Sequence, residues 1–403
     1  MIASLRFQVG LLAGLQALLL TNNATLIAVN ALAGMQLTDN KLFATLPVTG
    51  YVIGGAVWSM PAAYVMKRFG RRAGYSIGSV AAILGAMIAG YAMAIGSLWL
   101  LCFATFVCGL YNAFGVSFRF AAADVADAFK PSFKARAISL VLTGGIAGGI
   151  FGPEVSRWSR TALPQEFAGT YLMLGVFALC SLIIVQWLRV PAPPASSAAT
   201  APPRPLAEIF RQPAALVALA SAALGYGIMN LLMVATPLAM EVCSLPFDSA
   251  VFVLQWHIVG MFAPGLFTGA LIARFGVFQV IIAGALMLLA CVFIALSGVE
   301  LIHFAAALFL LGVGWNFMYT GGTTLLTTTY RPHEKNKVQG FMDTTVFIVM
   351  VTSSASSGAL LFVNGWSVLN LISLPFVVLV IVGAVWAASR LGWGLGQVRA
   401  AAG

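Results

Sequence analysis

"VPAPPASSAATAPPRP", residues 190–205, divides this chain into two parts of similar length. Proline, alanine and serine dominate the stretch, which is typical of an extended linker and not of a membrane-spanning helix. Six long apolar stretches precede it and six follow it. Each has about 20 residues or more, which is enough for a helix to cross a ~30 Å hydrocarbon core. We therefore predict twelve spanning helices.

The composition agrees with a chain that is solvated mostly by lipid. Hydrophobic residues make up 61% of the 403 residues, and charged residues only 8%. A water-soluble domain of this length would need more charge on its surface. Because the apolar stretches show no alternation with a period of two, helices are favoured over a β-barrel. The sequence therefore predicts an all-α membrane protein made of two six-helix bundles.

We expect an N-terminal six-helix bundle at 1–189, a cytoplasmic linker at 190–211 and a C-terminal six-helix bundle at 212–403 that holds a metal site. The expected spans are 8–36, 42–66, 74–95, 97–121, 137–158, 168–188, 213–240, 248–272, 277–298, 301–326, 338–363 and 366–389.

The positive charges give the orientation. Of the 21 lysines and arginines, 18 fall in loops on one side of these spans, and only Lys41, Arg157 and Arg160 fall on the other. The positive-inside rule then places both termini in the cytoplasm. This distribution also explains the net charge of +10 without a nucleic-acid partner. The five scattered cysteines predict no disulfide framework.

Two loops are repeated in the halves. The first loop is MKRFGRR (66–72), which follows the second span, and its counterpart LIARFGV (271–277) follows the eighth span. The second loop is KPSFKARAISL (130–140), which precedes the fifth span, and its counterpart RPHEKNKVQGF (331–341) precedes the eleventh span. Such repetition indicates duplication. The first loop resembles the Gly-x-x-x-Asp-Arg-x-Gly-Arg-Arg signature of major-facilitator transporters, and the matching residues are Arg68, Gly70, Arg71 and Arg72. The resemblance implies alternating access between two rocking halves.

Both copies depart from this signature at its acidic position. Lys67 stands there in the first copy and Ala273 in the second, and Ala63 replaces the first glycine. We therefore expect the family's usual ion-pair lock at this loop to be missing. GGIAGGIFGPE (144–154) resembles the Gly/Pro-rich motif of the family's fifth helix, whose small residues allow neighbouring helices to approach closely.

Ionisable groups within the membrane are functional candidates because they are costly there. Few are present, and Glu154 is the best candidate for a proton carrier; an interfacial ion pair with Arg157 is the alternative. The lack of acids at mid-membrane argues against a proton-coupled drug antiporter. The lack of a central arginine or lysine argues against a large organic anion. A soft or neutral cargo remains.

Soft donors occur on two consecutive spans. Met229 and Met233 lie four residues apart on the seventh span, and His257 and Met261 lie four apart on the eighth. Each pair shares one helical face. A rise of 1.5 Å per residue puts all four between ~10 and ~20 Å from the outer helix ends. Thioethers and imidazole bind copper(I) without a carboxylate, so these four residues are candidate metal ligands. Core packing of methionine and a hydrogen-bonded histidine are the alternative.

The same four residues resemble the MxxxM and HxxxM motifs of CcoA-like bacterial copper importers. That resemblance implies copper(I) import as substrate transport, in support of cbb₃-type cytochrome c oxidase assembly, with copper donor or acceptor proteins as possible partners. Cys243, near the outer end of the seventh span, is a weaker candidate for copper capture. Two alternatives stay open: a transporter of a small organic solute or drug, and a copper receptor or assembly factor that does not transport. We expect a monomer in the lipid bilayer, with no cofactor, no catalytic residues and no enzyme activity.

Overall fold

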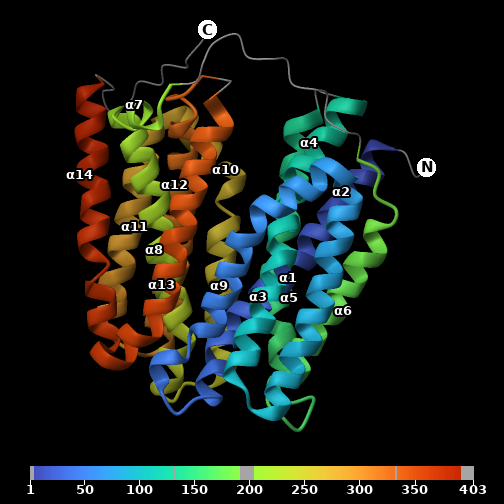
Figure 1. The fold of residues 1–403 in the computed structure, drawn as a ribbon. Helices are drawn as coiled ribbons and strands as arrows, with labels where there is room; N and C mark the ends of the chain where they lie inside the picture. The colour runs from blue at the N-terminus through green and yellow to red at the C-terminus, as the bar shows by residue number, and fades with distance from the viewer. Residues whose placement is uncertain (1–3, 131–132, 191–203, 332–333, 392–403) are drawn as a thin grey trace. The chain divides into compact units, whose positions relative to one another are not determined.

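The computed structural model describes residues 4–130, 133–190, 204–331 and 334–391, and these form helices joined by short loops. The first half contains α1 (Leu5–Gln36), the 3₁₀ turn η1 (Lys41–Phe43), α2 (Leu46–Ile95), α3 (Leu98–Gly115), α4 (Phe118–Phe129), α5 (Lys134–Ser159) and α6 (Ala168–Val185). The second half contains α7 (Leu206–Ile209), α8 (Pro213–Val242), α9 (Phe247–Phe262), α10 (Gly265–Phe275), α11 (Val277–Ser297), α12 (Leu301–Leu326), α13 (Lys335–Leu371) and α14 (Leu374–Arg390). Figure 1 shows most of these helices as long rods.

The predicted all-α membrane fold is confirmed. Eight helices or joined helix runs in the described residues are long and apolar enough to cross a membrane, and the bent pair α9–α10 makes nine. Two of the runs, Lys41–Ile95 and Lys337–Arg390, have 55 and 54 residues, so each holds two crossings of about 20 residues. With the glycine-rich α5, these helices account for the twelve predicted spans.

Glycines with positive φ mark the breaks inside the two long runs. Gly70 has φ of 84° in α2, and Gly365 has φ of 81° in α13. A residue with a Cβ adopts this conformation only with strain, so glycine lets the chain turn from one span into the next. Both breaks lie where the sequence predicted a loop between spans.

Two predicted spans are interrupted in the structure. The span expected at 248–272 is bent by 43° between α9 and α10. Pro264 precedes α10, and its missing N–H interrupts the helical hydrogen bonds. The span expected at 97–121 is divided into α3 and α4 at Val116–Ser117 and continues to Phe129, eight residues beyond its expected end.

Glycines of α5 pack directly on α1, as the small-residue motif predicted. Gly144, Gly148 and Gly152 recur every four residues, so they form one stripe along α5. A Cβ at Gly148 would lie 2.6 Å from the carbonyl oxygen of Ala17 and 2.7 Å from the backbone nitrogen of Thr21. Only hydrogen fits at this distance, so these glycines set the separation of the two helices.

Contacts divide the chain into two compact units. The first contains residues 1–194, 234–258 and 354–362, and the second contains 195–233, 259–353 and 363–403. The first unit thus joins the N-terminal half with the C-terminal end of α8, most of α9 and residues 354–362 of α13. The predicted boundaries at 1–189 and 212–403 describe a duplication, which compactness does not test, and they stay a prediction. Most of the predicted linker 190–211 lies outside the described residues.

The first unit has an ion pair where the sequence predicted none. The Arg71 side chain donates to Asp124 of α4, with 2.9 Å between Nε and Oδ2, and also to the hydroxyl of Tyr75. The expectation of a missing lock is therefore wrong for the first half. The carboxylate comes from α4 and not from the loop itself, which is why the loop sequence alone did not indicate it.

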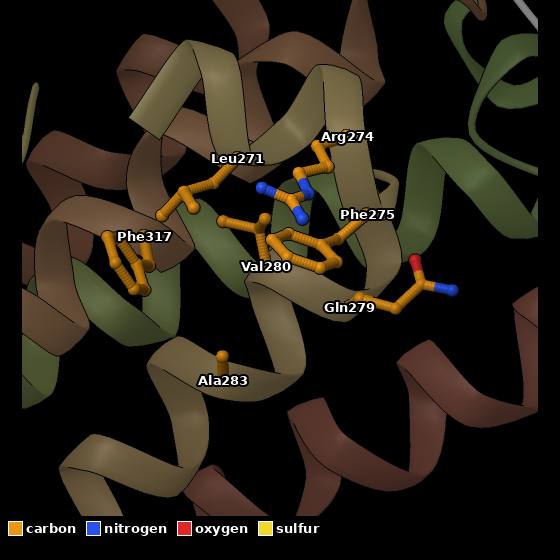
Figure 2. A pocket seen from close by; sticks show the side chains of 7 residues that line it. All are labelled: Leu271, Arg274, Phe275, Gln279, Val280, Ala283 and Phe317. Atoms are coloured by element: carbon orange, nitrogen blue, oxygen red, sulfur yellow. The ribbon is translucent and has the colours of Figure 1, made fainter. Parts of the chain in front are cut away.

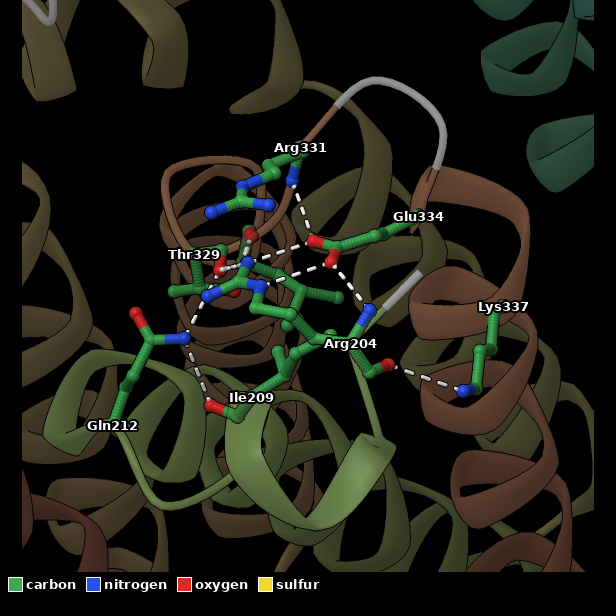
Figure 3. Close-up of polar contacts among 8 residues, drawn as sticks. Arg204, Ile209, Gln212, Thr329, Arg331, Glu334 and Lys337 are labelled. Carbon is green, nitrogen blue, oxygen red and sulfur yellow. Dashed lines mark hydrogen bonds and ion pairs between the residues drawn. The ribbon is translucent and has the colours of Figure 1, made fainter. Parts of the chain in front are cut away.

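In the second unit, the residues before α7 are bound to the loop between α12 and α13 (Figure 3). The Glu334 carboxylate is 0% exposed and pairs with Arg204 at 2.7 Å. It also accepts hydrogen bonds from the backbone N–H groups of Arg204 and Arg331, both at 2.9 Å. The Arg204 hydrogen bonds and these backbone donors hold the pKa of Glu334 well below its usual range, against the opposing effect of burial. Lys337 donates in turn to the Arg204 carbonyl.

Candidate functional site

The four predicted copper ligands are all buried in the structure. Met229 and Met233 lie on α8 and are 1% and 5% exposed, whereas His257 and Met261 lie on α9 and are 0% and 7% exposed. Burial fits both a ligand and a packing role, so it does not separate the two interpretations.

The grouping of these four side chains around one ion stays a prediction. Met229, Met233 and Met261 belong to the second unit and His257 to the first. Among the described residues, no group of three or more histidine, cysteine, aspartate or glutamate side chains lies close enough to hold a metal ion. Cys243 is a free, half-buried cysteine.

Four aromatic residues form a cluster within the second unit, which we call the aromatic cluster: Tyr226 of α8, Phe262 of α9, and Trp315 and Tyr319 of α12. Trp315 and Tyr319 stack with 5.4 Å between ring centroids and 8° between planes. Tyr226 meets both edge-on, at 5.2 Å and 5.4 Å. Phe262 lies 6.3 Å from Trp315. Sequence reasoning missed this cluster, although the four-residue spacing of Trp315 and Tyr319 on one helix was a usable signal.

The aromatic cluster contains a buried donor. Trp315 is 6% exposed, and its indole Nε1 has no hydrogen-bond partner among the described residues. The next residue, Asn316, is engaged on both sides of its amide: Nδ2 donates to the Met261 carbonyl and Oδ1 accepts from Thr268, each at 2.7 Å. These bonds fix α12 against α9 and α10. Tyr226, Phe262 and Tyr319 are half-buried, so the cluster has one buried and three partly accessible rings.

In the first unit, asparagines of α1 and α3 bond to one another and to tyrosines. Asn23 donates to Asn112 at 3.1 Å and accepts from the Tyr51 hydroxyl. Asn30 accepts from Tyr171 at 2.8 Å. A small pocket of about 10 Å³ beside Asn22 and Asn23 has room for about one water.

Glu154 makes the ion pair that the sequence offered as the alternative to proton transfer. Its Oε2 lies 3.2 Å from Arg157, with side chains 35% and 49% exposed respectively. Its Oε1 accepts from Gln255 of α9, which also donates to the Ile150 carbonyl.

A pocket of about 500 Å³ lies in the second unit beside α10, α11 and α12 (Figure 2). Its lining is apolar apart from Arg274 and Gln279, and the Arg274 guanidinium lies 5.2 Å from the Phe275 ring centroid. Phe275 is 47% exposed. An apolar groove with an exposed ring lacks the convergent polar groups of a solute site, so we do not assign transported cargo to it.

Comparison with known proteins identifies the family. The family model described as Major Facilitator Superfamily matches residues 11–351. The chain belongs to this superfamily. It is therefore a multi-pass membrane protein of a transporter family, and the part of the predicted resemblance that concerns the superfamily is confirmed.

Among relatives of this major-facilitator chain is the riboflavin transporter RfnT of Brucella anthropi. The two are 36% identical over 369 residues, which are 91% of this chain and 92% of that protein. The uncharacterised transporter YddS of Bacillus subtilis is 27% identical, over 91% of this chain and 87% of YddS. Neither name refers to copper, so the CcoA-like part of the resemblance receives no support from these relatives.

Solved structures share the fold. A mutant of the nucleoside transporter NupG aligns with a TM-score of 0.74 at 13% identity, covering 95% of this chain and all of that one. A D-xylose–proton symporter aligns with a TM-score of 0.74 at 12% identity, covering 98% of each chain. At such low identity the match concerns the fold and not the substrate.

Proposed function

We propose that this protein transports a small organic solute with a flat, fused ring system, namely riboflavin or a close chemical relative, by alternating access across a bacterial inner membrane. The aromatic cluster is the observation that carries this proposal. Three of its rings, Tyr226, Trp315 and Tyr319, are in mutual contact, and two of them are partly accessible. Flat rings are held by such surfaces through stacking and edge-to-face contacts.

Riboflavin consists of an uncharged tricyclic ring with two carbonyl groups and a tail of hydroxyl groups. The ring suits the faces of the aromatic cluster in the second unit. The hydroxyl groups suit phenol and amide side chains of the same unit, such as those of Tyr226, Tyr319 and Asn230. A neutral cargo also fits the scarcity of buried charge, because 8% of the residues are charged.

The similarity to the riboflavin transporter of Brucella anthropi supports the same cargo, since it extends over 91% of this chain. The remaining features belong to the proposal: cytoplasmic termini, rocking of residues 1–189 against 212–403, a monomeric carrier in the lipid bilayer, and no nucleic-acid partner. The orientation is supported by the 18-to-3 distribution of lysines and arginines.

Uptake by reconstituted vesicles tests the cargo. Purified protein in liposomes should accumulate radiolabelled riboflavin above the level of empty liposomes. Excess lumichrome, which keeps the ring and lacks the tail, should compete, whereas ribitol should compete weakly. If the protein-containing vesicles take up no riboflavin, the proposed cargo is wrong.

Copper(I) import is the second candidate, because four soft donors are buried on adjacent helices: Met229, Met233, His257 and Met261. The same vesicles separate the two candidates. If the protein imports copper, wild-type vesicles should take up labelled copper under reducing conditions, and this uptake should be lost in M233A and H257A. Riboflavin transport requires that both variants keep riboflavin uptake, unless their packing also shapes the solute site. A copper receptor that does not transport would bind copper without accumulation inside the vesicles.

A further inference from the structure

Trp315 lies at the centre of the aromatic cluster and has an N–H group without an acceptor. It is 6% exposed, and its Nε1 is among the buried polar atoms that lack a partner within the described residues. The hydrocarbon of a membrane offers no acceptor to such a donor, so the group is costly to leave unpaired. Trp58 also has an unpaired Nε1, but it is only half-buried.

No side chain or carbonyl group of the described residues accepts a hydrogen bond from this N–H. The Asn316 amide oxygen already accepts from Thr268, and the Met261 carbonyl already accepts from Asn316. Tyr226 meets the indole edge-on, with 89° between the ring planes. An N–H directed at a ring face is a much weaker interaction than an N–H to an oxygen. The packing therefore holds the Trp315 N–H in place for an acceptor on a molecule that is not part of the chain.

The geometry restricts that group. An indole N–H points outward in the plane of the ring, so its acceptor lies at the ring edge and close to that plane. Tyr319 is within 8° of parallel to the indole. A flat molecule that continues the indole plane would therefore lie parallel to Tyr319. None of the four residues of the aromatic cluster carries a positive charge, which favours a neutral acceptor over a carboxylate or phosphate.

We propose that Trp315 Nε1 donates a hydrogen bond to a ring carbonyl oxygen of the transported solute, whose flat ring packs against Tyr226 and Tyr319. This inference rests on the proposed function and makes the cargo class narrower: fused heteroaromatic rings with a carbonyl at the edge, of which flavins are one kind. Trp315 thereby determines specificity, because a site with a buried donor disfavours ring compounds that leave the donor unpaired. Purely hydrocarbon rings are disfavoured for that reason.

The test measures binding to the purified full-length protein by isothermal titration calorimetry. The proteins are wild type, W315F, and W386F as the matched control, since Trp386 is 44% exposed on α14. The ligands are riboflavin and its 2-thio and 4-thio analogues, in which sulfur replaces one ring carbonyl oxygen and accepts hydrogen bonds less well. W315F keeps an aromatic face and loses only the N–H and one ring, and its folding is checked by thermal unfolding.

Wild type should bind one thio analogue about tenfold more weakly than riboflavin, as expected for one lost hydrogen bond. W315F should bind riboflavin about tenfold more weakly and should no longer distinguish it from that analogue, whereas W386F should behave as wild type. A packing role alone would weaken all ligands equally. If wild type binds all three ligands equally well, the inference is overturned. This comparison requires no variant.

A failure of the proposed function gives a different result. If wild type does not bind riboflavin, the same proteins are tested with lumazine, xanthine and uracil, which also carry ring carbonyls. Binding of one of them with loss in W315F supports the role of Trp315 and rejects riboflavin as cargo. Binding of none of them rejects both proposals.

Discussion

At the scale of single residues, most buried polar groups that we describe have a hydrogen-bond partner. The indole N–H of Trp315, at the centre of the aromatic cluster, is an exception. Asn230 donates to the Met350 carbonyl and to Ser353, and Glu334 is surrounded by donors. Trp315 Nε1, with no acceptor among the described residues, differs from these groups. In lipid such an exception is expensive, and it therefore indicates a functional position more strongly than an exposed polar residue would.

Tyr319 should contribute to affinity through its ring. The change Y319L removes the ring that stacks on Trp315, whereas Y319F keeps it. A stacked aromatic pair is worth about 0.5–1.5 kcal/mol beyond its buried area, so Y319L should raise the KM for riboflavin about two- to tenfold. Y319F should stay closer to wild type. Uptake kinetics in liposomes measure both, and an unchanged KM in Y319L would contradict a role of this ring in binding.

Glu334 should stabilise the protein at neutral pH. Its pKa is lowered in the folded state, so its contribution is complete above the unfolded pKa of about 4.3 and is lost as the pH falls through the folded pKa. E334Q should therefore unfold at a lower temperature than wild type at pH 7. The difference should be the same at pH 5.5 and should shrink at acidic pH below about 4.

Thermal unfolding at these pH values measures the effect. E208Q is the matched control, because Glu208 of α7 is exposed, and its unfolding temperature should equal that of wild type. If E334Q unfolds at the wild-type temperature at pH 7, the network in Figure 3 does not hold the chain before α7 in place.

At the scale of helices, close packing depends on glycine stripes, and breaks depend on glycine and proline. α5 meets α1 through Gly144, Gly148 and Gly152, which face backbone atoms of α1. Helices in lipid gain little from hydrophobic burial against each other, so close van der Waals contact between backbones is the main source of their association. The small residues of α5 are therefore needed for stability whatever the cargo.

G148A should destabilise the protein. Its Cβ would lie 2.6 Å from the Ala17 carbonyl oxygen, and backbone atoms cannot rotate away as a side chain can. Overpacking of this kind costs about 1–3 kcal/mol, so the unfolding temperature should fall by several degrees. G14A on α1 is the control, because a Cβ there meets nothing within 4 Å. A stable G148A would show that the separation of α1 and α5 adjusts easily.

At the scale of the whole molecule, the alternating access that we propose requires that matching ends of the two halves separate and join in turn. Contacts inside the first unit join residues of α9 and α13 to the N-terminal half at one such end. Gly358 of α13 lies against Thr45, and Thr49 donates to Ser354 at 3.3 Å. Phe247 of α9 lies 5.9 Å from the Phe167 ring, and the Arg160 guanidinium lies 4.5 Å from the Phe247 ring.

A disulfide at this contact should stop transport. A Cβ at Gly358 would be 3.6 Å from the Cβ of Thr45, within the 3.5–4.5 Å range that disulfides require. In a background without the five native cysteines, oxidised T45C/G358C should form the bond and lose riboflavin uptake, and a reductant should restore it. The single-cysteine variants are the controls. Mass spectrometry measures the bond, and continued uptake by cross-linked protein would show that these ends need not separate.

The fold could be predicted largely from the sequence, because the membrane allows few solutions. Apolar stretches of sufficient length, a linker and two repeated loops were enough for the superfamily and the all-α architecture. The glycines of α5 also indicated close packing. These features are local in the chain, so they can be read without coordinates.

The sites were harder because they depend on side chains from distant parts of the sequence. Asp124 lies 53 positions after Arg71, and Tyr226 lies 89 positions before Trp315, so neither contact follows from spacing. Methionine spacing favoured copper because thioethers serve both packing and metal binding. By itself, the sequence determined which segments enter the lipid, since that depends on length and hydrophobicity. Only the tertiary structure decided which rings meet and which polar atom stays unpaired, since both depend on how helices far apart in the chain pack.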